Sequence, residues 1–358
     1  MARPTTLFAL PSPLERDAFA RAVLARDGHA CVLCGAREGT GVRLDAHHIL
    51  ERRLWPDGGY HLDNGATVCD RGPDGCHMRC ERTDVSVEDL RLACGIARPL
   101  LPPDLYEDQI YDKWGNVVLD NGQRMRGPLF HDPSVQKVIA HHLHLFTPFV
   151  KHPRTWHLPW SPGATSDDRI LAHTSAFEGE EVVVTRKMDG EQFSGYRQGS
   201  HARSVDGRGH PSRDWAKRAW AQRAHDLPDG WRVTCENLYA VHSLRYTELP
   251  SFLMGFMVWD DANTCLSWDD TVLWFGLLDL PVVEVLYRGP WDPDRIRALH
   301  APQDDAAHEG YVVRVAKAFP YQAFSRSVAK YVRPNHVTTD RHWMRGRRLE
   351  ANGLAQTP

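Results

Sequence analysis

A lysine stands at the end of a β-branched run in the segment VVVTRKMDGEQFSGY, residues 182–196. The run before Lys187 predicts a strand. The Met-Asp-Gly that follows the lysine predicts a turn, after which extended structure resumes. A lysine in this position is either the last solvated residue of an ordinary hairpin or an amine held on a rigid element as a nucleophile. A nucleophilic amine must be deprotonated, and partial burial and neighbouring cations lower its pKa. The spacing alone favours the hairpin, because Lys-x-Asp-Gly is a common string.

Five of the eight cysteines fall between Cys31 and Cys80. Cys31 and Cys34 form a C-x-x-C pair, and with Cys69 and Cys76 they supply the four thiolates of a closed tetrahedral Zn²⁺ site. The spacing from Cys69 to Cys76 is longer than the usual two-residue knuckle, so Cys80 remains an alternative to Cys76. A region this small has a limited core, and a structural Zn²⁺ ion is therefore expected to hold it together.

A second pattern lies among these cysteines: the pair His47-His48, then Asn64, then His77 beside Cys76. In order and spacing, residues 25–85 resemble the HNH nuclease family, whose ββα-metal fold sits inside such a zinc knuckle. The resemblance implies that His47 and His77 bind one divalent metal. Glu81, one helical turn after His77, is a possible further ligand.

The same resemblance implies that His48 is the general base and that Asn64 orients it. The chemistry is coherent, since a metal neutralises the scissile phosphate while an imidazole of near-neutral pKa takes a proton from water. The alternative is that the module only binds nucleic acid or only packs, with the histidine pair supporting the fold.

Downstream of Lys187 the chain contains, in order, HARSVDGRGHPSRDW, CENLYAVHSLRY, FLMGFMVWD, HEGYVVRV and SVAKYVRPNHVTTDRHW. Each string by itself is weak evidence for a function. In this order, across residues 186–343, they look like the collinear motifs of covalent nucleotidyltransferases and, within those, of ATP-dependent RNA ligases. The resemblance implies that Lys187 attacks the α-phosphate of ATP, forms a lysyl–AMP phosphoramidate and releases pyrophosphate.

The resemblance also assigns roles to five positions. Arg203 is expected near the phosphate and ribose, and Glu236 at the ribose hydroxyls. Phe256 would stack on adenine. Glu309 would help to hold Mg²⁺ or Mn²⁺, and Lys330 would contact the α-phosphate, where metal and basic groups offset charge during in-line displacement.

One departure from the family concerns its last motif, which often carries two lysines two residues apart. Val328 and Val332 stand at that distance from Lys330 here, and Arg333 could compensate. The alternative interpretation of the other positions is structural: Glu236 and Glu309 as strand-end carboxylates and the Phe256 run as core. The joint occurrence of the motifs in the family's order favours the catalytic interpretation.

From about residue 165 onward, short β-branched runs alternate with loops and a few helices, which predicts an α+β protein. We expect residues 1–95 to form an N-terminal zinc-bound ββα-metal (HNH-like) module, closed by the helix SVEDLRLACGI with Ser86 as its N-cap. Residues 96–165 are expected to be a connector, with a hairpin turning at Asn121-Gly122 and a helix in DPSVQKVIAHHLHLF. Its histidines, His141 among them, have no second ligand group nearby in the sequence. Residues 166–345 are expected to form an antiparallel-sheet nucleotidyltransferase (ATP-grasp-like ligase) domain, and 346–358 a C-terminal tail.

The composition of the 358 residues is that of a soluble globular protein, and the net charge of −3 gives no global attraction to nucleic acid. No segment is long enough for a membrane span, and FLMGFMVW suits a buried strand. The N-terminus lacks a secretory h-region, which predicts a cytoplasmic protein whose paired cysteines bind metal. The stretch 326–348 is strongly basic and could contact a phosphate backbone.

We therefore expect a ligase that joins 5′-phosphate to 3′-hydroxyl ends at a nicked or broken RNA or DNA duplex, fused to an HNH-like endonuclease, in nucleic-acid repair or processing. The first alternative is a ligase whose zinc module only binds nucleic acid. The second is a non-catalytic nucleic-acid-binding scaffold.

Overall fold

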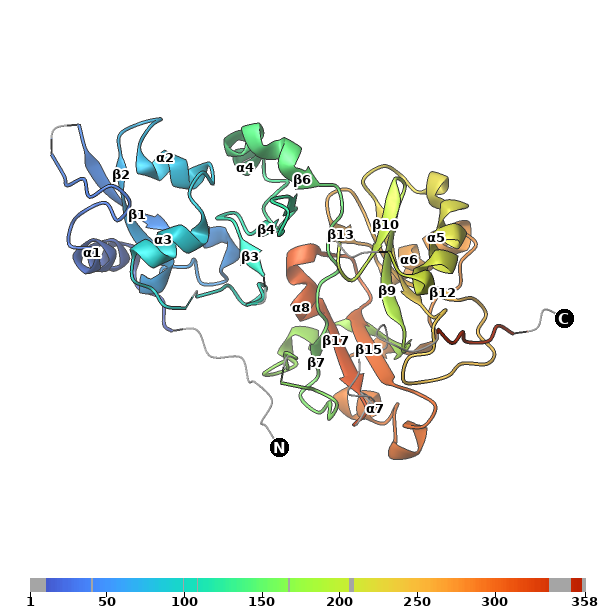
Figure 1. Ribbon diagram of the computed structural model, residues 1–358. Helices are drawn as coiled ribbons and strands as arrows, with labels where there is room; N and C mark the ends of the chain where they lie inside the picture. Colours follow the sequence, from blue (N-terminus) through green and yellow to red (C-terminus); the bar gives the residue numbers. More distant parts are fainter. Residues whose placement is uncertain are drawn as a thin grey trace. The chain divides into compact units, whose positions relative to one another are not determined.

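The computed structural model describes residues 11–39, 41–98, 100–107, 109–166, 168–205, 209–334 and 349–355. These residues form two compact units, an N-terminal unit that ends at Val150 and a C-terminal unit that begins at Lys151 (Figure 1). The expected connector is thus divided between the two units. Its first part belongs to the N-terminal unit because Ile96, Leu105 and Tyr111 are buried in the same core as the cysteines.

The N-terminal unit is built on a short antiparallel ribbon, in which His48 pairs with Gly65 and Arg43 with Asp70. A second sheet of four two-residue strands follows, in the order β3-β4-β5-β6. The elements of the unit are α1 (Arg16–Arg26), β1 (Arg43–His48), β2 (Gly65–Asp70), α2 (Cys76–Glu81), α3 (Val87–Ala93), β3 (Ile110–Tyr111), β4 (Val117–Val118), β5 (Arg124–Met125), α4 (Pro133–Val138) and β6 (Phe146–Thr147).

The C-terminal unit contains two sheets, of strand order β10-β9-β11-β12-β13-β16 and β14-β8-β15-β17-β7. All the pairings in both sheets are antiparallel except β17 with β7. The elements are β7 (Trp156–His157), β8 (Glu181–Lys187), β9 (Glu191–Tyr196), β10 (Gly199–Ala202), α5 (Asp214–Ala221), β11 (Arg232–Asn237), β12 (Leu253–Trp259), β13 (Thr264–Cys265), α6 (Trp268–Leu277), β14 (Val285–Pro290), α7 (Pro293–Arg297), β15 (Gly310–Val315), β16 (Phe319–Pro320), α8 (Phe324–Ser327) and β17 (Val328–Val332).

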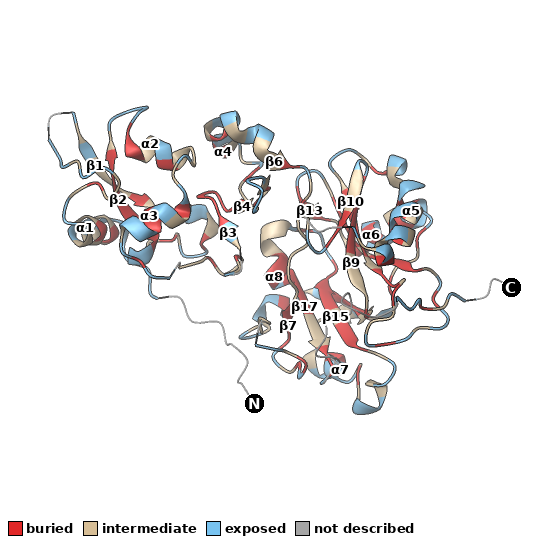
Figure 2. Ribbon diagram, in the orientation of Figure 1, coloured by how far each residue is buried: buried red, intermediate tan, exposed pale blue. Residues whose placement is uncertain are grey.

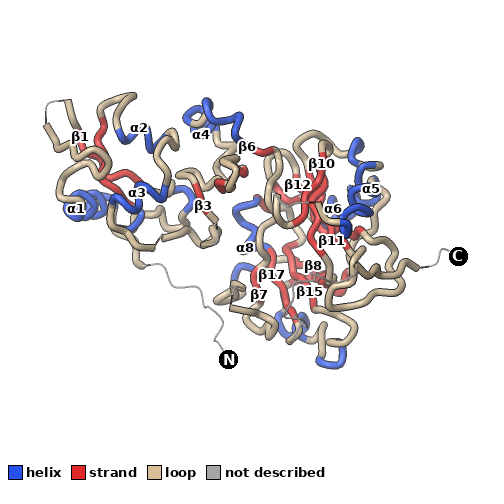
Figure 3. Tube along the Cα trace, in the orientation of Figure 1, coloured by secondary structure: helices blue, strands red, loops and turns tan. Residues whose placement is uncertain are grey.

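The two sheets of the C-terminal unit share a buried core, in which Val184 of β8 and Val313 of β15 lie with Trp259 of β12. A second core, formed by Trp220 of α5 and Phe275 of α6 with side chains of β9, β11 and β12, covers the six-stranded sheet. Figure 2 shows the burial of the central strands, and Figure 3 shows α5 and α6 beside them. The expected α+β architecture with antiparallel sheets is confirmed.

Two glycines allow the helices to approach the six-stranded sheet. A Cβ on Gly195 of β9 would lie 2.5 Å from the ring of Trp220, and a Cβ on Gly255 of β12 would lie 2.2 Å from the ring of Phe275. Side chains at these positions would push both helices away, so the sheet surface must be bare where the aromatic rings contact it.

Within the described ranges, none of the helices is long and apolar enough to cross a membrane.

Candidate active site and candidate metal sites

Strand register places the predicted nucleophile beside a carboxylate of the neighbouring strand. β15 lies between β8 and β17, so that Gly310 pairs with Lys187 on one side and with Val332 on the other. Glu309 immediately precedes Gly310, and its Oε2 accepts a 2.5 Å hydrogen bond from Lys187 Nζ. The same register brings Lys330 of β17 opposite Val312. Three of the predicted site residues therefore come from adjacent strands.

The charge environment of Lys187 differs from the expected one. Burial disfavours its ammonium form, but the carboxylates of Glu309 and Glu236 outweigh burial and raise the pKa of Lys187. Burial also raises the pKa of Glu236 to about 8, against the opposing effect of the Lys187 charge. These groups favour the ammonium form of the lysine, whereas the sequence interpretation required neighbouring cations that lower its pKa.

A pocket lies in front of Lys187, and most of the residues predicted to bind nucleotide line it. Its wall comes from both sheets and from the segment that precedes β7. The predicted residues among its lining are Lys187, Arg203, Glu236, Phe256 and Lys330. Arg333 is not part of that lining: its side chain is buried, and its backbone N–H donates to the carbonyl of Glu309 at 2.9 Å.

Asp168, which the sequence motifs did not indicate, also lines the pocket and lies next to two basic residues. Asp168 Oδ1 is 3.4 Å from Lys330 Nζ, and Asp168 Oδ2 is 3.5 Å from His157 Nε2. Burial would raise the pKa of Asp168, but the nearby His157 and the Lys330 charge outweigh it and lower that pKa. Burial is the main cause that lowers the pKa of Lys330. Asp168 is therefore the counter-ion of Lys330 in the pocket.

His152 is a second lining residue that the motifs missed. Its ring meets that of Phe256 edge-on, with centroids 5.7 Å apart, and its buried Nδ1 has no hydrogen-bond partner among the described residues. Burial, with the charge of Arg232, lowers the pKa of His152 to about 3, so the ring is neutral. Like His157, it lies in the segment interpreted as a connector, and the parallel pairing of β7 with β17 helps to hold that segment at the pocket.

The C-terminal unit can now be compared with known proteins. Residues 180–332 match the family model for RNA ligase. The match runs from just before β8 to the end of β17 and confirms the RNA ligase resemblance over these residues, which we call the ligase segment. No curated protein matches the chain.

Solved structures of ligases are also similar to the chain. One is a Naegleria gruberi RNA ligase mutant with AMP and Mn, at 14% identity and a TM-score of 0.37, with coverage of 52% of this chain and 56% of that one. Another is a putative ATP-dependent DNA ligase from Aquifex aeolicus, at 15% identity and a TM-score of 0.36, with coverage of 64% and 55%. The chain spans about half the length of these structures.

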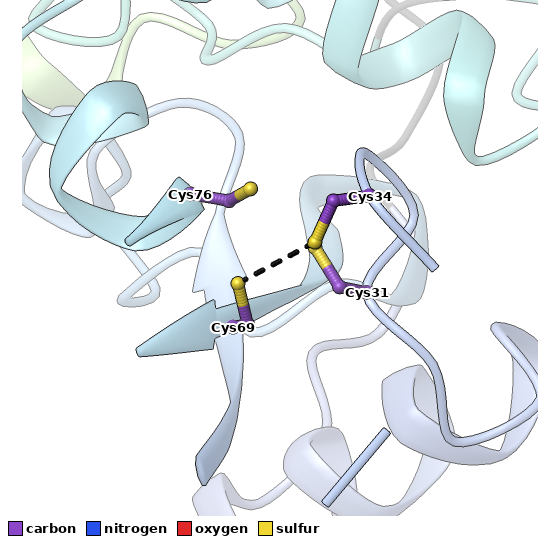
Figure 4. Close-up of side chains that lie close together, drawn as sticks. All are labelled: Cys31, Cys34, Cys69 and Cys76. Atoms are coloured by element: carbon purple, nitrogen blue, oxygen red, sulfur yellow. Dashed lines mark hydrogen bonds between the residues drawn. The ribbon is translucent and has the colours of Figure 1, made fainter. Parts of the chain in front are cut away.

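Outside the ligase segment, the N-terminal unit brings four cysteines together. The Sγ atoms of Cys31, Cys34, Cys69 and Cys76 all lie within 4.8 Å of one another, and Cys34 and Cys69 are 3.6 Å apart (Figure 4). Four converging thiols fit a tetrahedral Zn²⁺ ion. Cys80 is buried one turn further along α2 and is not part of this group. Of the two alternatives that the sequence left open, the structure places Cys76 in the cluster.

The predicted HNH-like ligands also lie together. Glu81 Oε1 is 3.5 Å from His47 Nδ1 and 3.5 Å from His77 Nε2. A fourth group, which no motif indicated, joins them: the ammonium of Lys113, 2.5 Å from Glu81 Oε1. Lys113 lies in the segment interpreted as a connector, and nothing in its sequence neighbourhood connects it with the histidines.

The other two HNH-like residues, His48 and Asn64, make packing and backbone contacts within the N-terminal unit. His48 stacks on Phe19 with ring centroids 4.9 Å apart, and burial together with the Lys113 charge lowers its pKa to about 4. The buried amide of Asn64 accepts from the backbone N–H of Leu50 and donates to the carbonyls of Leu50 and Gly59. Asn64 thus fixes the loop after His48 through the backbone.

A third grouping corrects an expectation from the sequence. Asp84 Oδ1 is 3.2 Å from His142 Nε2 and 3.7 Å from His141 Nε2, so these histidines do have a further potential ligand nearby. Asp84 and His141 are exposed. The predicted nucleic-acid contacts of the basic stretch from residue 335 to residue 348 lie outside the described residues.

Proposed function

We propose that the chain is an ATP-dependent polynucleotide ligase that carries AMP on Lys187. One observation carries this proposal: a partly buried lysine at a strand end lines a pocket that also contains Glu236, Phe256 and Lys330, within the segment that matches the RNA ligase model. A solvated hairpin lysine would not be partly buried beside a carboxylate in the wall of such a pocket.

In the first step, Lys187 Nζ forms a bond to the α-phosphorus of ATP while the bond to pyrophosphate breaks. The ammonium must lose a proton before it attacks, and Glu309 Oε2, 2.5 Å away, is the acceptor within reach. Lys330 is placed to offset the charge on the α-phosphate oxygens. A neutral aromatic wall of Phe256 and His152 gives the purine a stacking surface.

The carboxylate of Glu309 is a hard oxygen ligand of the kind that Mg²⁺ or Mn²⁺ prefers, and Glu236 is proposed to bind the ribose hydroxyls. When bound, such an ion supplies positive charge against the phosphate oxygens. In the later steps, AMP passes from Lys187 to a 5′-phosphate end, and a 3′-hydroxyl then displaces AMP to form a phosphodiester. The proposed substrate is a nicked or broken RNA or DNA duplex.

For the N-terminal unit we propose a structural Zn²⁺ ion held by Cys31, Cys34, Cys69 and Cys76 and a role in gripping nucleic acid. The grouping of His47, His77 and Glu81 would favour a metal-dependent nuclease as a second function. Because the ammonium of Lys113 lies among these groups, we do not extend the proposal to cleavage.

The decisive experiment incubates the protein with α-labelled ATP and Mg²⁺ or Mn²⁺, followed by denaturing electrophoresis. We expect an acid-labile label on the wild-type chain and none on Lys187→Ala, because the phosphoramidate forms on that amine alone. Unlabelled ATP should compete better than GTP.

The matched control is Lys317→Ala, which removes an exposed lysine outside the pocket and should leave labelling unchanged. Persistent label on Lys187→Ala would refute the assignment of the nucleophile. Absence of label on the wild-type chain, with ATP and either metal, would favour the non-catalytic scaffold.

A further inference from the structure

Lys113 places a buried ammonium ion inside the HNH-like grouping of the N-terminal unit. Its side chain is almost fully buried. Nζ lies 2.5 Å from Glu81 Oε1, 3.3 Å from His47 Nε2 and 4.0 Å from Glu51 Oε2. It also lies over the ring of Trp114, 5.2 Å from the centroid. The ammonium is thus surrounded by groups that attract a cation.

The backbone around Lys113 is fixed, so its position does not depend on the side chain alone. Asp112, which is buried, accepts from the backbone N–H groups of Trp114 and Asn116 at 2.9 and 3.1 Å. The carbonyl of Lys113 accepts from the N–H of Glu51 at 2.9 Å, in the loop that follows the histidine pair. These backbone bonds therefore fix the position of Lys113 in the unit.

An ammonium group has three donors and no lone pair, so each of its bonds uses a lone pair of its partner. Lys113 binds the same oxygen, Glu81 Oε1, that faces both His47 and His77. A divalent ion bound to that oxygen at about 2.1 Å would lie at most about 4.6 Å from Nζ, since Nζ is itself 2.5 Å from the oxygen. The two cations would repel each other in a buried site.

In a metal site of this family, His47 would bind the metal through one ring nitrogen, and its other ring nitrogen would need a hydrogen-bond acceptor. A metal-bound imidazole normally donates its other ring N–H to a carboxylate, a carbonyl or water. Here the second nitrogen of His47, Nε2, faces the donor Lys113 at 3.3 Å. The surroundings of His47 suit an ammonium partner and do not fit the metal that the HNH resemblance implies.

We propose that Lys113 is the resident cation of the His47–His77–Glu81 site and that this site takes no divalent metal while Lys113 is present. The ammonium supplies the positive charge that Glu81 and Glu51 require. The N-terminal unit is then not a metal-dependent nuclease, and the alternative in which it only binds nucleic acid is favoured.

The test measures Mn²⁺ binding to the full, zinc-supplemented chain by the electron paramagnetic resonance signal of free Mn²⁺. Mn²⁺ is chosen because it prefers oxygen and nitrogen ligands to thiolates. Wild type should bind the same number of ions with and without His77→Ala. Lys113→Met should bind one more ion than wild type, and His77→Ala in that background should abolish the gain. Lys113→Arg, which keeps the positive charge, should behave as wild type.

Two results would overturn the proposal. The first is a loss of Mn²⁺ from wild type on His77→Ala, which would place an ion in the site beside Lys113. The second is a folded Lys113→Met chain that gains no ion. The melting temperature gives an independent readout: Mn²⁺ should raise it for Lys113→Met and not for Lys113→Arg. If Lys113→Met fails to fold, the comparison of wild type with His77→Ala still decides whether metal occupies the native site.

Discussion

The position of Lys187 depends on a residue without a side chain. A Cβ on Gly310 would lie 2.1 Å from the carbonyl oxygen of Tyr331, and the φ of Gly310, 148°, is one that other residues rarely adopt. Only glycine therefore lets β15 run this close to β17 at the point where Glu309 meets the lysine. The positions of the proposed nucleophile and its carboxylate partner therefore depend on backbone packing as well as on their own contacts.

The cysteine cluster gives a prediction at the same scale. Cys76→Ala should reduce the zinc content of the purified protein from about one ion per chain to near zero, because a closed site needs four ligands. It should also lower the melting temperature of the N-terminal unit, since structural zinc contributes to folding. Metal content is measured by mass spectrometry of the desalted protein.

The control for this prediction is Cys80→Ala. Cys80 is buried in the same helix but outside the group of four sulfur atoms, so its loss should leave the zinc content unchanged. Equal loss of zinc in both variants would contradict the assignment of Cys76.

At the scale of helices and strands, the stability of the C-terminal unit depends on the contact of α5 and α6 with the six-stranded sheet. Gly255→Ala should lower the free energy of unfolding of the C-terminal unit by about 1–3 kcal/mol, because the new methyl overlaps the buried ring of Phe275. Urea denaturation followed by tryptophan fluorescence measures the change. Gly276 lies in α6 itself, and a Cβ there would meet open space. Gly276→Ala should therefore stabilise the unit by up to about 1 kcal/mol, because alanine favours the helix more than glycine does. A neutral Gly255→Ala variant would show that the helix can move away without cost.

Several elements could be predicted from the sequence because their signals are local. Ser86 caps α3 by accepting from the N–H of Asp89, the hairpin of β4 and β5 turns at Gly122 with φ of 81°, and the run FLMGFMVW forms the buried strand β12. Each depends on a residue type at a fixed offset along the chain.

The parts of the sites that escaped prediction depend on tertiary contacts. Lys113 meets His47 across 66 residues, and Asp168 meets Lys330 across 162. Neither pair has a periodicity or a spacing that a single sequence could reveal. The structure brings Lys187, Glu309 and Lys330 of the ligase motifs together, but the raised pKa of Lys187 follows from its contacts with carboxyl groups, which motifs do not encode.

On the scale of the whole molecule, residues 349–355 pack against a part of the ligase segment that is far from them in the sequence. Asn352 is buried, donates through its amide to the carbonyls of Leu238 and Ala240, and accepts from the N–H of Tyr246. These bonds brace the loop that follows β11. The same loop donates two backbone N–H groups, each at 2.7 Å, to Asp189 Oδ2, two residues beyond Lys187.

This bracing predicts a long-range effect on activity. Asn352→Ala should destabilise the C-terminal unit by about 1–3 kcal/mol, because it leaves buried backbone groups unpaired. It should also slow the labelling of Lys187, since the turn at Asp189 loses its support. The measurement is the rate of label incorporation at a temperature where the variant is folded by circular dichroism.

Glu350→Ala is the matched control, because it removes only an ion pair with Arg245 in which both side chains are mostly exposed. Such a pair contributes at most about 1 kcal/mol. Similar rates for Asn352→Ala and Glu350→Ala would contradict a role for the returning segment in the site.

The parallel pairing of β7 with β17 has a consequence for the protein as it is being synthesised. His157, an early residue of the C-terminal unit, pairs with Lys330, which leaves the ribosome more than 170 residues later. Domains fold as units during translation, so a nascent chain that has already exposed Lys187 still lacks the strand that carries the opposing cation. The proposed loading of a nucleotide on Lys187 therefore has to wait until β17 has emerged, and a chain aborted before that point is expected to stay inert although it contains Lys187.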